Sequence, residues 1–201
     1  MAIKRESRFL EDHMDEVYTQ TLEKNFIGRE FLTWLWYFTE NDEGRFEVEL
    51  GQGKGKGKNH PAQVWLDDRI VLSAKTGRSH EHIIRGGVPS TSDEAAVSLK
   101  TGKSVKELKI ALEVNGIGPF VATLTGDDLT PRGLKLPEPD KNIDATPIEQ
   151  RIEYLATFTK GLETLFAKFM DERTDKLWET NRINSIRTWI QTRNHDASTI
   201  H

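Results

Sequence analysis

The sequence predicts an α+β fold: N-terminal helices, an antiparallel sheet of about five or six strands with one short inserted helix, and C-terminal helices. Three observations predict it. Near both ends of the chain, apolar residues recur every three or four positions, as in amphipathic helices. In the middle, short segments alternate apolar and polar residues, as in strands with one side in solvent. Residues typical of turns separate those segments.

Two helices are expected before the sheet. The first spans residues 5–24, where an apolar stripe runs opposite a charged face. The second spans residues 28–38, and its apolar residues are Phe31, Leu32, Trp34, Leu35, Trp36 and Phe38. This density of aromatic side chains indicates the hydrophobic anchor of the fold. The sequence Asn41-Asp42-Glu43-Gly44 is expected to end the second helix.

The first part of the sheet is predicted from alternation. Residues 45–50 alternate Phe, Val and Leu with Glu, which indicates a strand with one solvent-facing side. Residues 51–60 are expected to form a flexible loop. Residues 64–72 are interpreted as a hairpin that turns near Asp67-Asp68, and residues 80–86 could add another strand.

A short helix and a second hairpin are expected next. Thr91 and Glu94 have the spacing of a capping box, and Gly102 is placed to end the helix. Residues 103–124 alternate on both sides of Asn115-Gly116, a dipeptide typical of tight hairpin turns. One further short strand is expected over residues 133–136.

The C-terminal part is expected to be helical. A seven-residue apolar rhythm is kept by Ile148, Ile152, Leu155, Leu162, Phe166 and Phe169. Apolar residues from Trp178 to Ile190 predict a further helix. We therefore divide the chain into an α+β domain (1–147) and a C-terminal helical segment (148–201) that packs on it as one structural unit.

Composition limits the possible functions. With 201 residues the chain forms one large domain or two small ones, and with no Cys it has no disulfide, thiolate metal site or thiol nucleophile. Neither a signal-peptide core at the start nor an apolar run of membrane-spanning length is present. We expect a cytoplasmic or nucleoid-associated protein without a membrane partner.

Charge is distributed unevenly along the chain. The net charge is −4, yet residues 51–110 carry +5 while residues 1–50 carry −6 and residues 111–201 carry −3. Nucleic-acid binding depends on local clusters because salt screens distant charges. The candidate DNA contacts are Lys54, Lys56, Lys58, Arg69, Arg78, Arg85, Lys100, Lys103, Lys106 and Lys109. The alternative interpretation is an ordinary exposed edge protected by Lys.

The loop over residues 51–60 is the most basic part of this region. It carries three Lys separated by Gly and no acidic residue. Ammonium groups in such a setting could follow a phosphate backbone without reading sequence; a solvated hairpin loop is the alternative. The loop lacks the Gly-Lys-Ser/Thr spacing of a nucleotide cradle, and no small-molecule substrate is expected.

Catalytic and metal motifs are weak. His80-Glu81-His82 places two imidazoles on one strand face without a third ligand, so a metal-dependent enzyme is the least favoured hypothesis. Asp67-Asp68 and Asp127-Asp128 are typical of turns. We expect no catalytic residue, no metal and no cofactor.

The five Trp residues are expected to play different roles. Trp34, Trp36 and Trp65 could stack on bases, but their periodic setting favours core packing. The C-terminal segment is expected to form an oligomer interface through Trp178, Ile186 and Trp189. Its alternative role is a second basic patch, since Arg182, Arg187 and Arg193 lie there without an acidic neighbour.

Two blocks of short motifs carry a family resemblance. The first is Gly28–Trp36 followed by Val64–Leu72. The second comprises Thr91–Glu94, Gly102–Val105, Leu108–Leu112 and Gly133–Leu136. With Ile148–Phe169 in the place of a closing helix, these blocks resemble the C-terminal half of the RdgC family, the recombination-associated DNA-binding proteins. The resemblance covers about residues 28–170.

The resemblance implies non-catalytic, sequence-independent binding of double-stranded DNA by a ring-like dimer with a basic inner surface, which limits access of the RecA recombinase to DNA. The chain departs from the family in lacking its N-terminal half and in adding a helix with Trp178 and Trp189. From the family's ring-like dimer, a homo-oligomer (a dimer or a higher assembly) is expected. The alternative is a structural or interaction protein that keeps an RdgC-like fold, such as a phage virion component or an inhibitor of a host protein.

Overall fold

The computed structural model of the chain describes residues 26–51, 57–74, 81–86 and 92–192. Within them the expected α+β fold is confirmed, with a six-stranded antiparallel sheet and helices on both sides of it in sequence. The helix expected over residues 5–24 lies outside the described residues. The core cluster takes side chains from both sides of residue 147, so the sheet and the C-terminal helices share one hydrophobic core.

The sheet has the order β1-β2-β4-β5-β6. The sixth strand, β3, pairs with the second half of β2, on the edge where β1 pairs with the first half. Its strands are β1 (Arg45–Leu50), β2 (Lys58–Ser73), β3 (His82–Arg85), β4 (Ser104–Val114), β5 (Ile117–Thr125) and β6 (Arg132–Lys135). The second predicted hairpin is confirmed: β4 and β5 pair as antiparallel neighbours around Asn115-Gly116. Both turn residues have positive φ angles of 53° and 76°, which the two-residue turn of such a hairpin requires.

The helices are α2 (Phe26–Asn41), α3 (Asp93–Lys100), α4 (Pro147–Thr174) and α5 (Ile183–Thr192), and the π-helical turn η2 (Trp178–Arg182) leads into α5. Helix α2 is longer than predicted. Helix α3 ends before Gly102 as expected, but its N-cap is Ser92 and makes no side-chain hydrogen bond. At the start of α4, Thr146 and Glu149 form a complete capping box that the sequence analysis did not identify.

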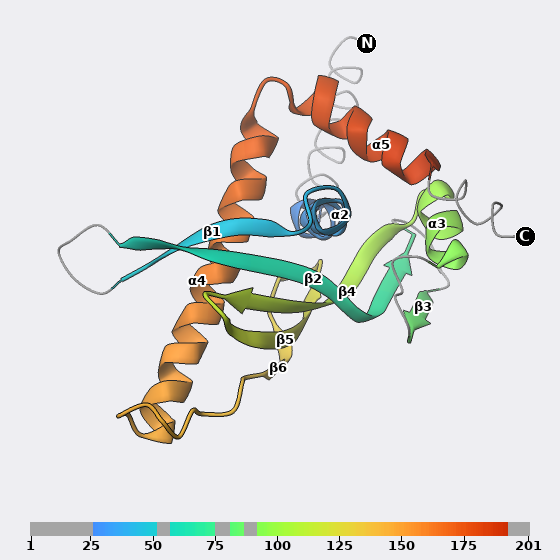
Figure 1. Ribbon diagram of the computed structural model, residues 1–201. Helices are drawn as coiled ribbons and strands as arrows, with labels where there is room; N and C mark the ends of the chain where they lie inside the picture. The colour runs from blue at the N-terminus through green and yellow to red at the C-terminus, as the bar shows by residue number, and fades with distance from the viewer. Residues whose placement is uncertain (1–25, 52–56, 75–80, 87–91, 193–201) are drawn as a thin grey trace, which may run out of the picture.

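Helix α2 is the centre of the fold. Almost every side chain from Phe31 to Phe38 is buried, as expected for a helix enclosed on all sides. Its rings pack against those of α4, with Phe31 edge-on to Phe166 at 5.3 Å between ring centroids and Trp34 tilted against Phe169 at 5.6 Å. In Figure 1, α2 is viewed nearly along its axis, with α4 running across the strands beside it.

Close contact between α2 and the sheet depends on glycine. A Cβ atom at Gly28 would lie 2.2 Å from the carbonyl oxygen of Gly126, at the end of β5. A side chain at Gly126 would in turn collide with Arg29. The two glycines let the backbones of helix and strand approach directly, which fixes the position of Arg29 near the strand ends.

The two faces of the sheet differ. Val64, Ile70, Leu108 and Leu112 belong to the core cluster beneath α2 and α4. Residues on the opposite face, such as Trp65, do not belong to that cluster. We call this opposite side the open face of the sheet. Its central row pairs Trp65 with Ala111 and Ala111 with Val121.

Candidate nucleic-acid interface

The predicted DNA contacts fall in three places. Lys54, Lys56 and Arg78 lie outside the described residues. Lys58 lies at the end of the β1–β2 ribbon, and Lys100 and Lys103 lie at the end of α3. The remaining four, Arg69, Arg85, Lys106 and Lys109, lie on or beside β2, β3 and β4.

Strands β1 and β2 form a two-stranded ribbon that projects beyond α4 (Figure 1). From Lys58 to Pro61, β2 pairs with β1 alone, because β4 joins β2 only from Ala62 onward. Lys58 is exposed and pairs with Leu50. The segment joining these two residues carries Lys54 and Lys56 in the sequence. The predicted loop is thus shorter than expected, since residues 58–60 are strand.

A bulge replaces the predicted hairpin turn at Asp67-Asp68. Strand β2 continues without a turn to Ser73, so the predicted turn is wrong. Between the pairs Leu66–Ile110 and Ile70–Leu108, three residues of β2 face a single residue of β4, Lys109. The extra residue of a bulge leaves the ladder and changes the direction of its side chain, which explains why both carboxylates reach Lys109.

Lys109 is held by both acids of the bulge. Its Nζ atom lies 2.9 Å from Asp67 Oδ2 and 2.7 Å from Asp68 Oδ1. The hydrogen bond and charge of Lys109 lower the pKa of Asp68, and those of the two Asp raise the pKa of Lys109. The charge of Lys109 is therefore compensated within the protein.

Two more predicted contacts carry carboxylate partners. Arg69 lies 2.8 Å from Glu107, and Lys106 contacts Glu81. Arg85 differs: it pairs in register with Arg69, is exposed, and has no acid within ion-pair distance in the described part of the chain. The expected strip of cations on this face is thus a mixture of positive and negative groups.

The end of α3 carries another basic group. Lys100 is the last residue of the helix and is exposed, and no described acid lies within ion-pair distance of it. Lys103 is half-buried after Gly102 and has an interaction partner of its own. Among the predicted residues beyond the ribbon that the structure describes, Lys100 and Arg85 are thus the two without an ion-pair partner there.

Of the three Trp residues expected in the core, one is on the surface. Trp34 and Trp36 are 1% and 0% exposed, whereas Trp65 is 37% exposed on the open face. The core prediction is therefore wrong for Trp65. Its place in an alternating strand, between the buried Val64 and the partly buried Leu66, was the signal that could have identified it.

The residues predicted for the oligomer interface are used within the chain. Trp178 packs edge-on against Phe169, and Trp189 packs edge-on against Trp36 and Tyr37. Trp178 and Trp189 are buried and Ile186 is partly buried against the same core. Any role of this segment in an oligomer would therefore fall to the exposed positions of α5 and not to the two indoles.

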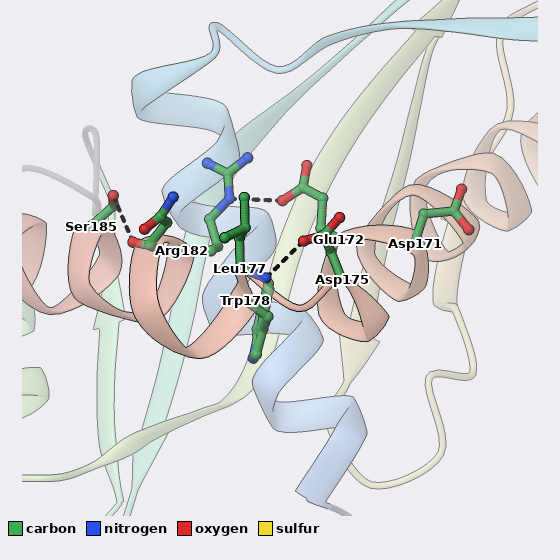
Figure 2. A pocket seen from close by; sticks show the side chains of 8 residues that line it. Asp171, Glu172, Asp175, Leu177, Trp178, Arg182 and Ser185 are labelled. Atoms are coloured by element: carbon green, nitrogen blue, oxygen red, sulfur yellow. Dashed lines mark hydrogen bonds and ion pairs between the residues drawn. The ribbon is translucent and has the colours of Figure 1, made fainter.

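A surface hollow lies where α4 ends and η2 begins (Figure 2). Arg182 reaches across it and donates from Nε to Glu172 at 2.8 Å. Glu172 also accepts a 2.9 Å hydrogen bond from Trp34 and forms an ion pair with Lys168. The two charged residues of the hollow are thus paired with each other, and this ion pair joins η2 to the end of α4.

No metal centre is formed by the described residues. Groups of three or more His, Asp or Glu side chains placed to hold an ion do not occur among them. His80 lies outside those residues, and the Nδ1 atom of His82 lies 2.8 Å from the hydroxyl of Ser98. Among the helices that the structure describes, none is long and apolar enough to span a membrane.

Comparisons with known proteins leave the family open. No family model matches the chain, and neither a curated protein nor a solved structure shows significant similarity to it.

Proposed function

We propose that this chain is a non-catalytic, oligomeric protein that binds double-stranded DNA without reading its sequence, and that it is an RdgC-related protein of recombination control. One observation carries the proposal: the projecting β1–β2 ribbon has Lys58 at its end, and its connection adds Lys54 and Lys56. No acidic residue lies between Gly51 and His60.

The physical basis is the match between such a ribbon and a DNA groove. A two-stranded antiparallel ribbon is narrow enough to enter the major groove. Lys contacts phosphate as a point charge and so positions the protein without selecting bases. On the ribbon itself, the negative charge of Glu47 is partly engaged by a hydrogen bond from Asn59 at 3.0 Å.

Arg85 and Lys100 are the secondary contacts in this proposal. Their charges have no described acidic partner, so a phosphate would not have to displace a carboxylate. Arg69 and Lys109 would have to exchange a carboxylate for phosphate. The ribbon should therefore supply most of the electrostatic affinity.

A salt series tests the proposal. The affinity of the wild-type protein for two unrelated 30-bp duplexes should fall linearly with log salt and be equal for both. A variant with Lys54, Lys56 and Lys58 changed to Glu should bind more than about tenfold more weakly at low salt. Its salt slope should be smaller by about 0.9 for each lost phosphate contact.

The charge-matched control changes Lys141, Arg151 and Lys176 to Glu. These residues are exposed and lie before, within and after α4, outside the strands of the ribbon. Their loss should weaken binding far less than loss of the ribbon Lys residues. Equal effects of the two triple variants, or no binding by the wild-type protein at low salt, would refute the ribbon as the DNA contact.

A structural or interaction protein is the second candidate, and a specific observation favours it. Along α4, Ile148, Ile152 and Leu155 are 72%, 64% and 49% exposed. They continue the apolar line that Phe166 and Phe169 bury against α2. An uncovered apolar stripe on a helix is typical of an interface.

Light scattering separates the two candidates. A variant that lacks residues 175–201 would be unsuitable for testing assembly, because the truncation also removes Trp178 and Trp189 from the core. The double variant Ile148→Lys, Ile152→Lys changes only exposed positions. If it dissociates a wild-type assembly that does not bind DNA, the structural reading is correct; if wild type and variant bind DNA equally, the first proposal stands.

A further inference from the structure

We infer that Arg29, Arg69 and Lys106 form a binding site for a backbone phosphate of DNA, and that the Glu81 carboxylate occupies this site in the free protein. The inference rests on the proposed DNA binding and identifies a contact away from the ribbon. It also makes Glu81 an internal competitor of DNA.

Lys106 is the centre of the site. It lies where β4 bulges, between the pairs Val71–Glu107 and Leu72–Val105. Its ammonium group contacts the Glu81 carboxylate, and both side chains remain partly exposed, at 28% and 42%. Glu81 directly precedes the short strand β3. A ligand from solvent can therefore reach the contact between the two groups.

Two guanidinium groups bind residues of β4 close to Lys106: Arg69 pairs with the adjacent Glu107, and Arg29 is hydrogen-bonded to Ser104, two residues before Lys106. The contact with Lys106 lowers the pKa of Glu81 most, and the charges of Arg29 and Arg69 lower it further. Arg69 is held by Glu107. Both of these arginines have a buried Nε donor without an acceptor among the described atoms, so the group of cations has more donors than its acids satisfy.

Arg29 is fixed in place from the other side of the sheet end. Its Nη1 atom lies 3.3 Å from Ser73 Oγ and 3.5 Å from Ser104 Oγ, and its Nη2 atom lies 3.3 Å from Asp127. The close approach of Gly28 to Gly126 sets this position. The charge therefore stands ready before any ligand arrives, which reduces the entropic cost of binding.

Charge and chemistry together select the ligand. Three cations face three carboxylates here, Glu81, Glu107 and Asp127. Displacement of Glu81 leaves one uncompensated positive charge beside partly exposed Arg and Lys side chains. A phosphodiester is a monoanion with two free oxygens, and guanidinium and ammonium donors bind that group well.

The test compares substitutions of two acids, the exposed Glu81 and the half-buried Glu113, for their effect on duplex binding at fixed salt. Glu81→Gln should raise affinity about fivefold, the scale of one surface ion pair, and steepen the salt slope by about one contact. Glu113→Gln is the charge-matched control. Glu113 lies on β4, the strand that carries Lys106, and has no ion-pair partner in the described part of the chain. It should change affinity less than about twofold.

A double-mutant cycle isolates the site. In a Lys106→Gln background, Glu81→Gln should no longer raise affinity, because the released cation is gone. Equal gains from Glu81→Gln and Glu113→Gln, or a gain that persists without Lys106, would overturn the inference as a general charge effect. If wild type binds DNA and Glu81→Gln binds equally, only this site is refuted; if no variant binds DNA, the proposed function falls with it.

Discussion

Trp189 donates an indole hydrogen bond of 2.8 Å to the carboxylate of Glu40, which joins α5 to the last turn of α2. Trp36 donates to the other oxygen of the same carboxylate at 2.7 Å. The C-terminal helix is thus attached to the centre of the fold by a buried aromatic contact and a charged acceptor, and η2 and Arg182 complete the attachment.

This attachment predicts the effect of removing one donor. Trp189→Phe keeps an aromatic ring but loses the hydrogen bond to a charged group, so it should lower the free energy of unfolding by about 2–3 kcal/mol. Thr188→Ala, at the exposed neighbouring position, should stay within about 0.5 kcal/mol of wild type. Urea denaturation measures both, and equal values would contradict the role of the contact.

The glycine contact between α2 and β5 gives a second prediction. Gly28→Ala gains about 1 kcal/mol of helix propensity, but its methyl group would collide with the Gly126 carbonyl. Overpacking costs about 1–3 kcal/mol, and a backbone atom cannot move aside as a side chain can. We expect net destabilisation by thermal unfolding, whereas Ile27→Ala, at an exposed position, should be nearly neutral. A stabilised Gly28→Ala protein would show that the helix lies farther from the strand.

The rotation of α4 can be tested with two residues of the same helix. Phe158 is 1% exposed against Phe120, whereas Ile152 is 64% exposed. Phe158→Ala should cost about 3–5 kcal/mol of unfolding free energy. Ile152→Ala should cost less than about 1 kcal/mol. The reverse order would mean that the predicted seven-residue stripe faces the core along the whole helix.

Acid should destabilise the protein in part through the capping box of α4. Hydrogen bonds from the backbone and hydroxyl of Thr146 lower the pKa of Glu149 in the folded chain. A lowered folded pKa gives stability that is present above the unfolded value, about 4.3, and is lost as the pH falls through the folded value. The Glu149→Gln protein should therefore lose stability less steeply than wild type between about pH 5 and pH 3. Parallel curves would exclude this contribution; Asp68 and Asp128, whose pKa values are also lowered, retain theirs in both proteins.

Periodicity predicted most elements correctly, because local patterns determine them. The alternation in residues 45–50 and the Asn115-Gly116 turn lie where the structure has β1 and the β4–β5 hairpin. The error at Asp67-Asp68 has a physical cause. Adjacent aspartates are as suitable for a bulge as for a turn, and only the partner strand, with Lys109 opposite, decides between them.

The candidate site was less predictable because ion pairs form between distant segments. Arg69 and Glu107, or Lys106 and Glu81, are separated by 25 residues or more in sequence, and no local pattern indicates that they meet. The sequence pattern does not indicate Arg29, since it lies in a hydrophobic block and reaches the sheet end only through the glycine contact. The sequence predicted the apolar stripe of α4 but not that its first part is exposed. That exposure depends on which turns of α4 contact α2.

Site-specific crosslinking tests the central claim most directly. Because the chain has no Cys, Asn59→Cys places one thiol-linked photocrosslinker on the ribbon beside Lys58, and Ile152→Cys places one on α4. We predict that the ribbon probe crosslinks to unrelated duplexes with equal yield, that high salt abolishes the reaction, and that the α4 probe stays unreacted. Crosslinks from α4 but not from the ribbon, or from neither position at low salt, would contradict the ribbon as the DNA contact.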